Sequence, residues 1–445
     1  MHIAIIGNGI SGTTAARHIR KLSDHKITLI SSETKYFFSR TALMYVYMGH
    51  MKFEHTQPYE DWFWEKNRID LVQAHVESID FQKKQLHFKE REALGYDALV
   101  LACGSASNKF GWPGQDLNGV QGLYSYQDLQ RMESLSPSTK HAIIVGGGLI
   151  GIEMAEMFHS RHIPATLLVR EDSFWNGVLP SGESAMINRE IERNGIGLRL
   201  NEELDEILDD GQGRVKGIKT KKGEIIDCQF VGLTVGVHPN IAFLKDTDLE
   251  LQKGILVDEY MQTNIPGVYA IGDCAQHRNP PEGRRPIEPV WYTGRMMGEV
   301  AAQNIAGKKT PYTPGPWFNS AKFINIEYQT YGAVSAQNPE GQASLYWEHE
   351  KGDKCIHIVY DQSDLTVRGV NTFGIRHRHG VWDKWLKEGR TLPYVVEHLH
   401  KANFDPELFK VYEDEVVDLY NQQFPQNPVK PKRKRRFLER IGLMG

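Results

Sequence analysis

The sequence has few cysteines and none close together, which excludes the commonest cysteine-based sites. Only four of the 445 residues are cysteine, and even the two nearest, Cys228 and Cys274, are far apart in the sequence. A C-x-x-C motif or a zinc ribbon needs cysteines separated by two residues, so we expect buried free thiols. The histidines show no ligand spacing either: His377 and His379 would point to different faces of a helix. We therefore expect no metal site.

Long apolar runs and a strong net charge are also missing. Mean hydropathy is −0.46, and no run approaches the roughly 20 apolar residues that span a bilayer, so we expect no transmembrane helix. The apolar run after His2 has no basic segment before it, so we expect no signal peptide and a cytoplasmic protein. The net charge of −4 is too small and of the wrong sign for a dedicated nucleic-acid binder.

A G-x-G-x-x-G motif lies between the first predicted strand, at residues 3–6, and a predicted helix. This context is typical of a dinucleotide-binding unit. The first glycine allows the tight turn, the second lets the backbone approach a pyrophosphate, and the third lets helix and strand pack closely. We expect Gly7, Gly9, Ile10, Ser11 and Gly12 to contact the cofactor.

Glu33 follows the next predicted strand, at residues 27–30, about twenty residues after the motif. A carboxylate at this place in a dinucleotide-binding unit binds the ribose hydroxyls. The alternative is a solvated acid at a strand end. We predict that Glu33 contacts the ribose.

A second motif of the same kind follows a predicted strand at residues 142–145 and precedes a helical segment at residues 152–158. Two such motifs predict two cofactors, one a tightly held flavin dinucleotide and the other an exchanging nicotinamide dinucleotide. The second set of cofactor-binding residues is Gly146, Gly148, Leu149, Ile150 and Gly151.

Arg170, and not a carboxylate, ends the strand predicted at residues 165–169. An arginine there suits a 2′-phosphate, which favours NADPH over NADH. The neighbouring Glu171 and Asp172 weaken this inference, and a solvated cation is the alternative.

Two further segments match a known pattern. Residues 96–105 are YDALVLACGS, and residues 263–273 are TNIPGVYAIGD. With the two glycine motifs, over roughly residues 1–335, the chain resembles the FAD- and NAD(P)-dependent pyridine nucleotide reductase family. The resemblance is to the branch of rubredoxin reductases, ferredoxin reductases and the nitrite reductase large subunit. Cys103 stands where this family usually has threonine.

The resemblance implies roles for particular residues. Asp273 would bond the ribityl chain of the flavin, and the helix after Val290 and Trp291 would point its N-terminal amides at the flavin. Glu153 would lie near the edge where nicotinamide meets flavin. Trp317 would be an aromatic residue beside the flavin, with packing in a core as an equally weighted alternative. The other cofactor-binding residues implied are Arg40, Cys103, Gly104, Gly236 and Gly272.

The redox-active cysteines of the disulfide reductases are missing. Residues 36–43 contain the Arg40 and Leu43 typical of rubredoxin reductases, with Thr41 where a thiol would lie. A hydroxyl cannot form a mixed disulfide, so thiol substrates are not expected. The expected chemistry is hydride transfer from nicotinamide to flavin N5, followed by electron delivery to an acceptor, without a redox-active disulfide.

The fold class implied is α/β, with two Rossmann-like dinucleotide-binding domains and a C-terminal α+β interface domain that has a helical extension. An NAD(P) domain inserted into the FAD domain would split it. Within the interface domain we predict strands at residues 346–348 and 356–360, then helices from Val370 to Phe424. The predicted boundaries are 1–112 and 237–315 for the FAD domain, 113–236 for the NAD(P) domain, 316–424 for the interface domain and 425–445 for a basic amphipathic tail.

The tail concentrates positive charge at the end of an otherwise acidic chain. The segment Lys430–Arg440 has seven basic residues and one acid, and apolar residues follow it up to Met444. Such a segment is able to lie on an anionic membrane surface at the inner face of the membrane. The alternatives are that it folds back on the acidic stretch Glu413–Glu415 and Asp418, or that it is disordered.

Three functions are therefore considered. The first is an NAD(P)H-dependent FAD oxidoreductase that passes electrons to a carrier protein: a rubredoxin, a ferredoxin or a partner redox subunit. The second is a membrane-surface NAD(P)H:quinone-type reductase, and the third is a redox-sensing interaction flavoprotein. A homodimer is a further hypothesis, and no nucleic-acid partner is expected.

Overall fold

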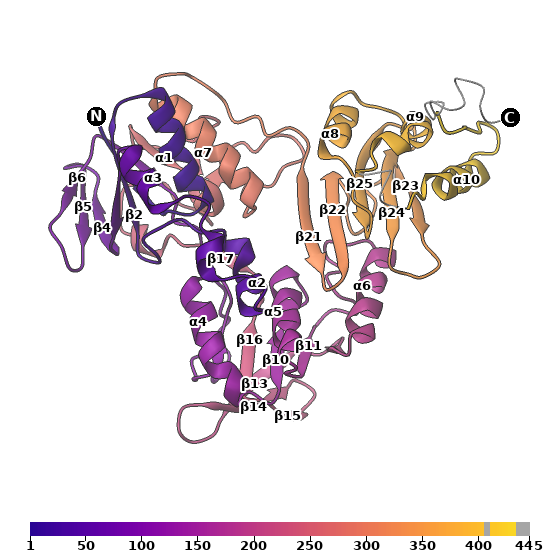
Figure 1. Cartoon of the computed structure of the whole chain (residues 1–445), viewed down its shortest axis with the longest axis horizontal. Helices are drawn as coiled ribbons and strands as arrows, with labels where there is room; N and C mark the ends of the chain where they lie inside the picture. The colour runs from indigo at the N-terminus through magenta and orange to yellow at the C-terminus, as the bar shows by residue number, and fades with distance from the viewer. Residues whose placement is uncertain (405–409, 433–445) are drawn as a thin grey trace. The chain divides into compact units, whose positions relative to one another are not determined.

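The computed structural model describes residues 1–404 and 410–432, and the chain forms two compact units (Figure 1). The first unit comprises Met1–Arg170 and Ile196–Pro314, and the second comprises Glu171–Gly195 and the chain from Gly315 onward. Most of the basic tail predicted from the sequence lies outside the described residues, which end at Lys432.

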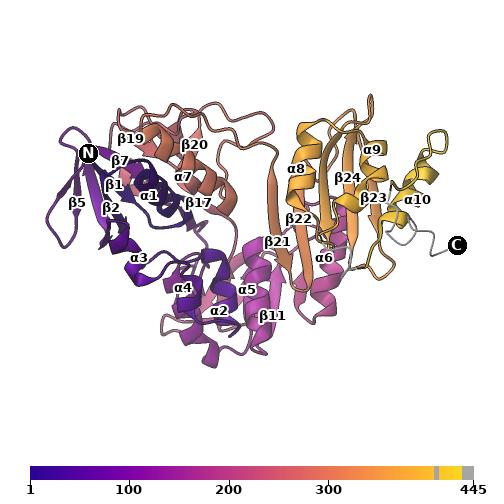
Figure 2. The same ribbon diagram turned by 45° about the horizontal axis from the view of Figure 1, so that its top comes forward.

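The first unit begins with a parallel five-stranded sheet in the order β19-β7-β1-β2-β3. Its central strands are short runs of aliphatic residues buried on both faces, as parallel sheets require. Helices α1 (Ile10–Leu22) and α7 (Trp291–Ile305) lie side by side in both views (Figures 1 and 2). The strands are β1 (His2–Ile6), β2 (Lys26–Ser31), β3 (Ile69–Gln73), β7 (Ala98–Leu101) and β19 (Val268–Ala270).

A second parallel sheet in the same unit has the order β12-β11-β10-β16-β9. Helices α4 (Tyr126–Leu135) and α5 (Leu149–Ser160) belong to this part. Two antiparallel strands, β8 (Ser105–Ser107) and β17 (Val237–Pro239), pair where the chain passes between the two sheets. The strands of the second sheet are β9 (Val120–Gln121), β10 (Ala142–Val145), β11 (Ala165–Leu168), β12 (Gly197–Arg199) and β16 (Phe230–Leu233).

Smaller elements complete the first unit. Two three-stranded antiparallel sheets and one two-stranded parallel pair accompany the large sheets, together with two short helices. These elements are α2 (Leu43–Tyr47), α3 (Asp61–Lys66), β4 (Val76–Asp80), β5 (Gln85–Phe88), β6 (Leu94–Gly95), β13 (Leu204–Asp209), β14 (Val215–Thr220), β15 (Ile225–Asp227), β18 (Ile255–Val257) and β20 (Ala275–His277).

The second unit is built on an antiparallel sheet in the order β21-β22-β25-β24-β23. One face packs its aliphatic residues against Trp382 and Trp385 of α8 and against α9 and α10. The elements are β21 (Phe318–Phe323), β22 (Ile326–Gly332), β23 (Gln342–Glu348), β24 (Cys355–Asp361), β25 (Val367–Phe373), α8 (His379–Lys387), α9 (Leu392–Glu397) and α10 (Glu413–Gln423).

Helix α6 (Ser181–Arg193) attaches to the same sheet through a buried carboxylate. Glu183 is completely buried and accepts hydrogen bonds from His357 Nδ1 at 2.9 Å and from Asn371 Nδ2 at 2.8 Å. A buried charge needs such partners to offset its lost hydration. This bonding explains why Glu171–Gly195 belongs to the second unit.

The helices predicted from Val370 onward begin later than the sequence suggested. The strands predicted at 346–348 and 356–360 are confirmed as parts of β23 and β24, but Val370 lies within β25, and the first helix of this region starts at His379. β25 shows no clean alternation, because the polar residues Asn371 and Thr372 are buried along with Val370 and Phe373. A short segment without a clear period does not distinguish strand from helix.

His377 makes the stability of the protein pH-dependent. It is buried, accepts a hydrogen bond from the Trp382 indole at Nδ1 (3.0 Å), and its pKa is lowered by burial to about 3. An unfolded histidine has a pKa of about 6.5, so the stabilisation is complete above that pH and is lost as the pH falls toward 3. His377→Asn should therefore flatten the fall in Tm between about pH 7 and pH 4.5. Thermal unfolding measures this, with exposed His55→Asn as the control; equal slopes in His377→Asn and wild type would contradict it.

Candidate functional site

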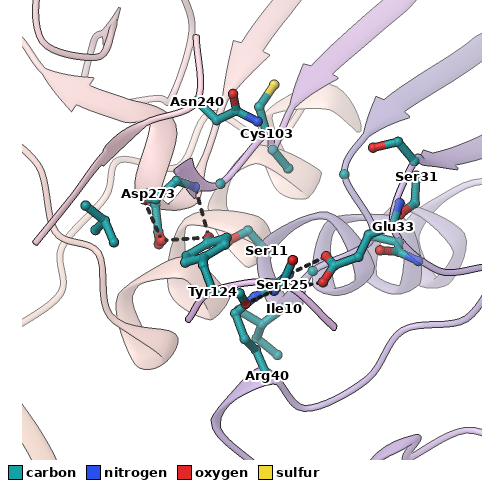
Figure 3. A pocket seen from close by; sticks show the side chains of 18 of the residues that line it. Ile10, Ser11, Ser31, Glu33, Arg40, Cys103, Tyr124, Ser125, Asn240 and Asp273 are labelled. Carbon is teal, nitrogen blue, oxygen red and sulfur yellow. Dashed lines mark hydrogen bonds and ion pairs between the residues drawn. The ribbon is translucent and has the colours of Figure 1, made fainter. Parts of the chain in front are cut away.

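A cavity of about 820 Å³ opens at the carboxyl ends of the strands of the first sheet (Figure 3). Ligand sites of open α/β sheets occupy this position. Residues of β1 and β2 line it, together with the segments that follow β7 and β19. Of the predicted site residues, those that line the cavity are Gly7, Gly9, Ile10, Ser11, Glu33, Arg40, Cys103, Gly104, Leu149, Ile150, Glu153, Asp273 and Trp291.

The three glycines of the first motif serve different steric purposes. A Cβ on Gly7 would lie 2.0 Å from the Ala102 carbonyl oxygen, and one on Gly12 would lie 1.9 Å from the Gly7 carbonyl oxygen. Gly7 also has φ +108°, which favours glycine. A Cβ on Gly9, the N-cap of α1, would meet no atom within 4 Å. Gly9 therefore leaves open space at a helix N-terminus, where backbone N–H groups favour a phosphate.

Glu33 is already engaged by protein donors. Arg40 Nη1 donates to its Oε1 at 2.9 Å, Arg40 Nη2 to its Oε2 at 2.6 Å, and the Tyr126 backbone N–H to Oε1 at 2.8 Å. Burial opposes the charge of Arg40, yet its bonds to Glu33 raise its pKa. A carboxylate has about four acceptor sites, so one position on Oε2 is left for a further donor.

Asp273 lies at the other side of the cavity and is held by two hydroxyls. Ser105 Oγ donates to Asp273 Oδ2 at 3.0 Å, and Tyr124 Oη donates to the same oxygen at 3.3 Å. Burial raises the pKa of Asp273, while the two hydroxyls and Arg40 act in the opposite direction. The carboxylate is thus oriented by its partners before a ligand arrives.

Tyr124 and Ser105 were missed in the sequence analysis. Tyr124 lies one residue before Ser125, the N-cap of α4, and Asp128 completes a capping box with that serine. The capping pattern S-x-x-D was visible in the sequence and locates the start of this helix. Nothing local indicated that the preceding aromatic residue enters a cavity.

A buried ion pair precedes α7, the helix that begins at the cavity. Arg284 Nε and Nη2 donate to the two oxygens of Glu288 at 2.5 and 2.9 Å, and both side chains are almost completely buried. Tyr312 Oη donates to Glu288 Oε2 at 3.1 Å, and Thr293 Oγ1 donates to the Glu288 carbonyl oxygen at 2.9 Å. These bonds fix the loop that leads into α7, whose first residue, Trp291, lines the cavity.

The second glycine motif has the same steric logic. A Cβ on Gly146, which has φ +123°, would lie 2.6 Å from the Thr234 carbonyl oxygen, and one on Gly151 would lie 2.6 Å from the Gly146 carbonyl oxygen. Helix α5 begins directly after Gly148. Its first turns reach the cavity through Leu149, Ile150 and Glu153. Glu153 is half-buried at the cavity wall, and its loss of hydration raises its pKa to about 7, with a smaller contribution from Glu156.

The remaining predicted residues lie elsewhere. Arg170 is exposed and follows the end of β11, and Gly236 lies where the chain returns between the sheets. Trp317 belongs to the second unit. Those that do not line the cavity are Gly12, Gly146, Gly148, Gly151, Arg170, Gly236, Gly272, Val290 and Trp317.

The four cysteines are free, and the segment after β2 presents Thr41 to the cavity. Among residues 1–404 and 410–432, no group of three or more His, Cys, Asp or Glu side chains is placed to hold a metal ion. No helix in the described part of the chain is long and apolar enough to cross a membrane.

Residues 1–303 match the model of the pyridine nucleotide-disulphide oxidoreductase family. The chain belongs to this family. It is 30% identical to the NADH-rubredoxin oxidoreductase of Clostridium acetobutylicum over 379 residues, which cover 83% of this chain and 90% of that protein. The family resemblance and the α/β fold inferred from the sequence are thereby confirmed. The family binds FAD and NAD(P)H.

Other relatives are longer, or share only the fold. Nitrite reductase [NAD(P)H] of Bacillus subtilis is 27% identical over 79% of this chain and 43% of its own length. The chain thus spans about half the length of the curated relatives it matches first. An engineered water-forming NADPH oxidase, derived from the NADH oxidase of Lactobacillus brevis, has a TM-score of 0.79 at 17% identity. That match covers 96% of this chain and 99% of that one, and shows the fold alone.

Breaking the buried pair before α7 should destabilise the protein strongly. Glu288→Gln leaves the Arg284 guanidinium buried without its carboxylate, which typically costs about 3–5 kcal/mol. Urea unfolding measures the loss. The double variant Arg284→Met, Glu288→Leu removes both charges and should recover much of it. A Glu288→Gln protein as stable as wild type would contradict this prediction.

Proposed function

We propose that this protein is an NAD(P)H-dependent FAD oxidoreductase that passes electrons to a carrier protein such as a rubredoxin or a ferredoxin. The observation that carries this proposal is that one cavity is lined by the first turns of both glycine-motif helices, at Ile10 of α1 and at Leu149 of α5. This arrangement suits two dinucleotides whose reactive ends meet. Names of relatives agree with it: several are rubredoxin or ferredoxin reductases.

The residues present fit FAD. Gly9 leaves the space that a pyrophosphate needs, Glu33 has one acceptor position left for a ribose hydroxyl, and Asp273 is oriented at the opposite side. When bound, the flavin would accept a hydride from the nicotinamide and release electrons to an acceptor. The protein supplies binding, orientation and exclusion of water.

The acceptor is proposed to be a carrier and not a disulfide. Thr41 lines the cavity in the segment where disulfide reductases need a cysteine. An alcohol oxygen cannot take part in thiol–disulfide exchange. The proposed function has three parts: FAD binding, reduction by NAD(P)H and electron transfer to a carrier. The absorbance spectrum of the purified protein tests the first, anaerobic titration with NADH and NADPH tests the second, and addition of rubredoxin or ferredoxin tests the third. A protein without a flavin band, or one whose reduced flavin transfers no electrons to either carrier, would contradict the proposal.

The finer preference for NADPH is part of the proposal and rests on Arg170. This residue follows the end of β11, where a dinucleotide's adenosine ribose lies in this fold. The engineered NADPH oxidase offers a chemical parallel, because its five substitutions remove one aspartate and introduce two arginines. An arginine pairs with a 2′-phosphate and has no partner of that kind on NADH.

Arg170→Ala should therefore weaken the binding of NADPH by about tenfold or more and leave that of NADH nearly unchanged, since charge-assisted hydrogen bonds contribute about 1.5–3 kcal/mol. Titration of the oxidised protein with each nucleotide measures both dissociation constants. Arg131→Ala, an exposed change on α4, is the matched control. Equal losses for the two nucleotides would exclude a phosphate contact.

Glu153 is proposed to make flavin reduction pH-dependent. Because burial raises its pKa to about 7, the carboxyl is neutral below that pH and anionic above it. A hydride brings negative charge into the cavity, so the neutral carboxyl favours the transfer. The rate of flavin reduction should fall as the pH rises through about 7, and Glu153→Gln should keep the rate of the neutral form at high pH. Stopped-flow absorbance measures this; Glu203→Gln, on the surface, should behave as wild type.

The membrane-surface and homodimer hypotheses rest on sequence alone. Lys432, near the start of the basic segment, pairs with Glu397 at 2.7 Å, and its backbone N–H bonds the Glu397 carbonyl oxygen at 2.8 Å. The rest of the segment, residues 433–445, lies outside the described residues. Electron transfer to a carrier protein is accordingly the function that the cavity supports.

A further inference from the structure

Tyr124 lines the cavity between Asp273 on one side and Arg40 and Glu33 on the other (Figure 3). On one side its hydroxyl donates to Asp273 Oδ2 at 3.3 Å and accepts the Ser105 backbone N–H at 2.9 Å. Burial, followed by the charge of Asp273, raises the pKa of Tyr124, so the hydroxyl keeps its proton and acts as a donor to the carboxylate.

On the other side, Tyr124 contacts Arg40. The guanidinium carbon of Arg40 lies 4.4 Å from the centre of the tyrosine ring, a cation–π arrangement, and Arg40 Nη1 donates to the Tyr124 carbonyl oxygen. The same guanidinium binds both oxygens of Glu33. Tyr124 thus contacts Arg40 directly and is linked to Glu33 through Arg40.

The surrounding chain holds Tyr124 in this place. Its backbone N–H and that of Ser125 both donate to Asp128 Oδ2, at 3.0 and 2.8 Å, within the capping box of α4. Gly104 has φ +68°, and a Cβ there would lie 2.7 Å from the Tyr124 hydroxyl. A side chain at position 104 would displace the hydroxyl from Asp273.

We propose that Tyr124 is a positioning residue for the flavin: it keeps Asp273 and the Arg40–Glu33 pair in fixed relation, so that the two sides of the site bind one cofactor together. This inference rests on the proposed function, because it assumes that FAD occupies the cavity. Both hydroxyl bonds to the carboxylate end on Oδ2. That geometry orients Asp273 and leaves Oδ1 to the ligand.

The test compares holoenzymes by the rate at which FAD is released on dilution, followed by the rise in flavin fluorescence. Tyr124→Phe keeps the ring under Arg40 and loses only the hydroxyl, and we expect release about tenfold faster than in wild type. Tyr124→Leu also removes the ring and should release FAD faster still. In excess FAD, the free energy of unfolding of Tyr124→Phe, measured with urea, should fall below that of wild type by no more than about 1.4 kcal/mol, the loss that tenfold weaker FAD binding accounts for. A larger loss would indicate a merely structural role and would overturn the inference.

Tyr59→Phe is the matched control. Tyr59 also has an arginine over its ring, with Arg17 Cζ at 5.0 Å from the ring centre, but it does not line the cavity. Release at the wild-type rate is expected. Wild-type release from Tyr124→Phe, or equally fast release from Tyr59→Phe, would overturn the inference while leaving the proposed function intact. A wild-type protein that contains no flavin would overturn both.

Discussion

The close approach of α1 to β1, which leaves no room for a side chain, is the constraint on which the site depends. Gly12 lets the first turn of the helix lie against the Gly7 carbonyl oxygen, and Gly7 lets the loop between β1 and α1 lie against the Ala102 carbonyl oxygen, directly after β7. Helix α7 extends this packing, because a Cβ on Gly298 would lie 2.6 Å from the Ser11 carbonyl oxygen. Removing side chains at these contacts brings two helix N-termini, and with them unpaired N–H groups, to the edge of one cavity.

Around this backbone frame, several charged side chains of the first unit are held by protein partners. Arg40 faces Glu33, Arg284 faces Glu288, and Asp273 is bonded by two hydroxyls. Burying an unpaired charge costs several kcal/mol, so each partner is needed to keep the other ionised and in place. Because of this pairing, the polar groups that a ligand can bind in the cavity are the oriented acceptor oxygens of Asp273 and Glu33 and the open helix N-terminus at Gly9. A cofactor that matches these groups needs little rearrangement of the protein, which favours tight binding.

The features that were predicted correctly from the sequence are those that depend on residues within one short segment. Both glycine motifs, their flanking strands and the family resemblance depend on residues within a few positions of one another. The features it did not predict arise from distant pairing. Tyr124 meets Asp273 across 149 positions, and Glu183 meets His357 across 174 positions. Likewise, Val370 belongs to a strand only because β22 and β24 flank it. A residue pattern within a short segment carries no information about such distant neighbours. The position of Tyr124 at the cavity and the attachment of α6 could therefore be found only in the structure.

Under the proposed function, the lack of a reactive thiol among the described residues that line the cavity also constrains how electrons leave. Thr41 cannot be oxidised to a disulfide. Cys103, the cysteine that lines the cavity, is a poor nucleophile, because its hydrogen bond with Cys274 and its burial raise the pKa of its thiol and keep it protonated. Under the proposed function, no protein thiol then stands between the flavin and the acceptor. The acceptor must approach the cofactor closely enough to take electrons directly, and it needs an open route to the flavin edge. A small carrier protein with an exposed redox centre meets that requirement, whereas a substrate that must first form a bond to sulfur does not.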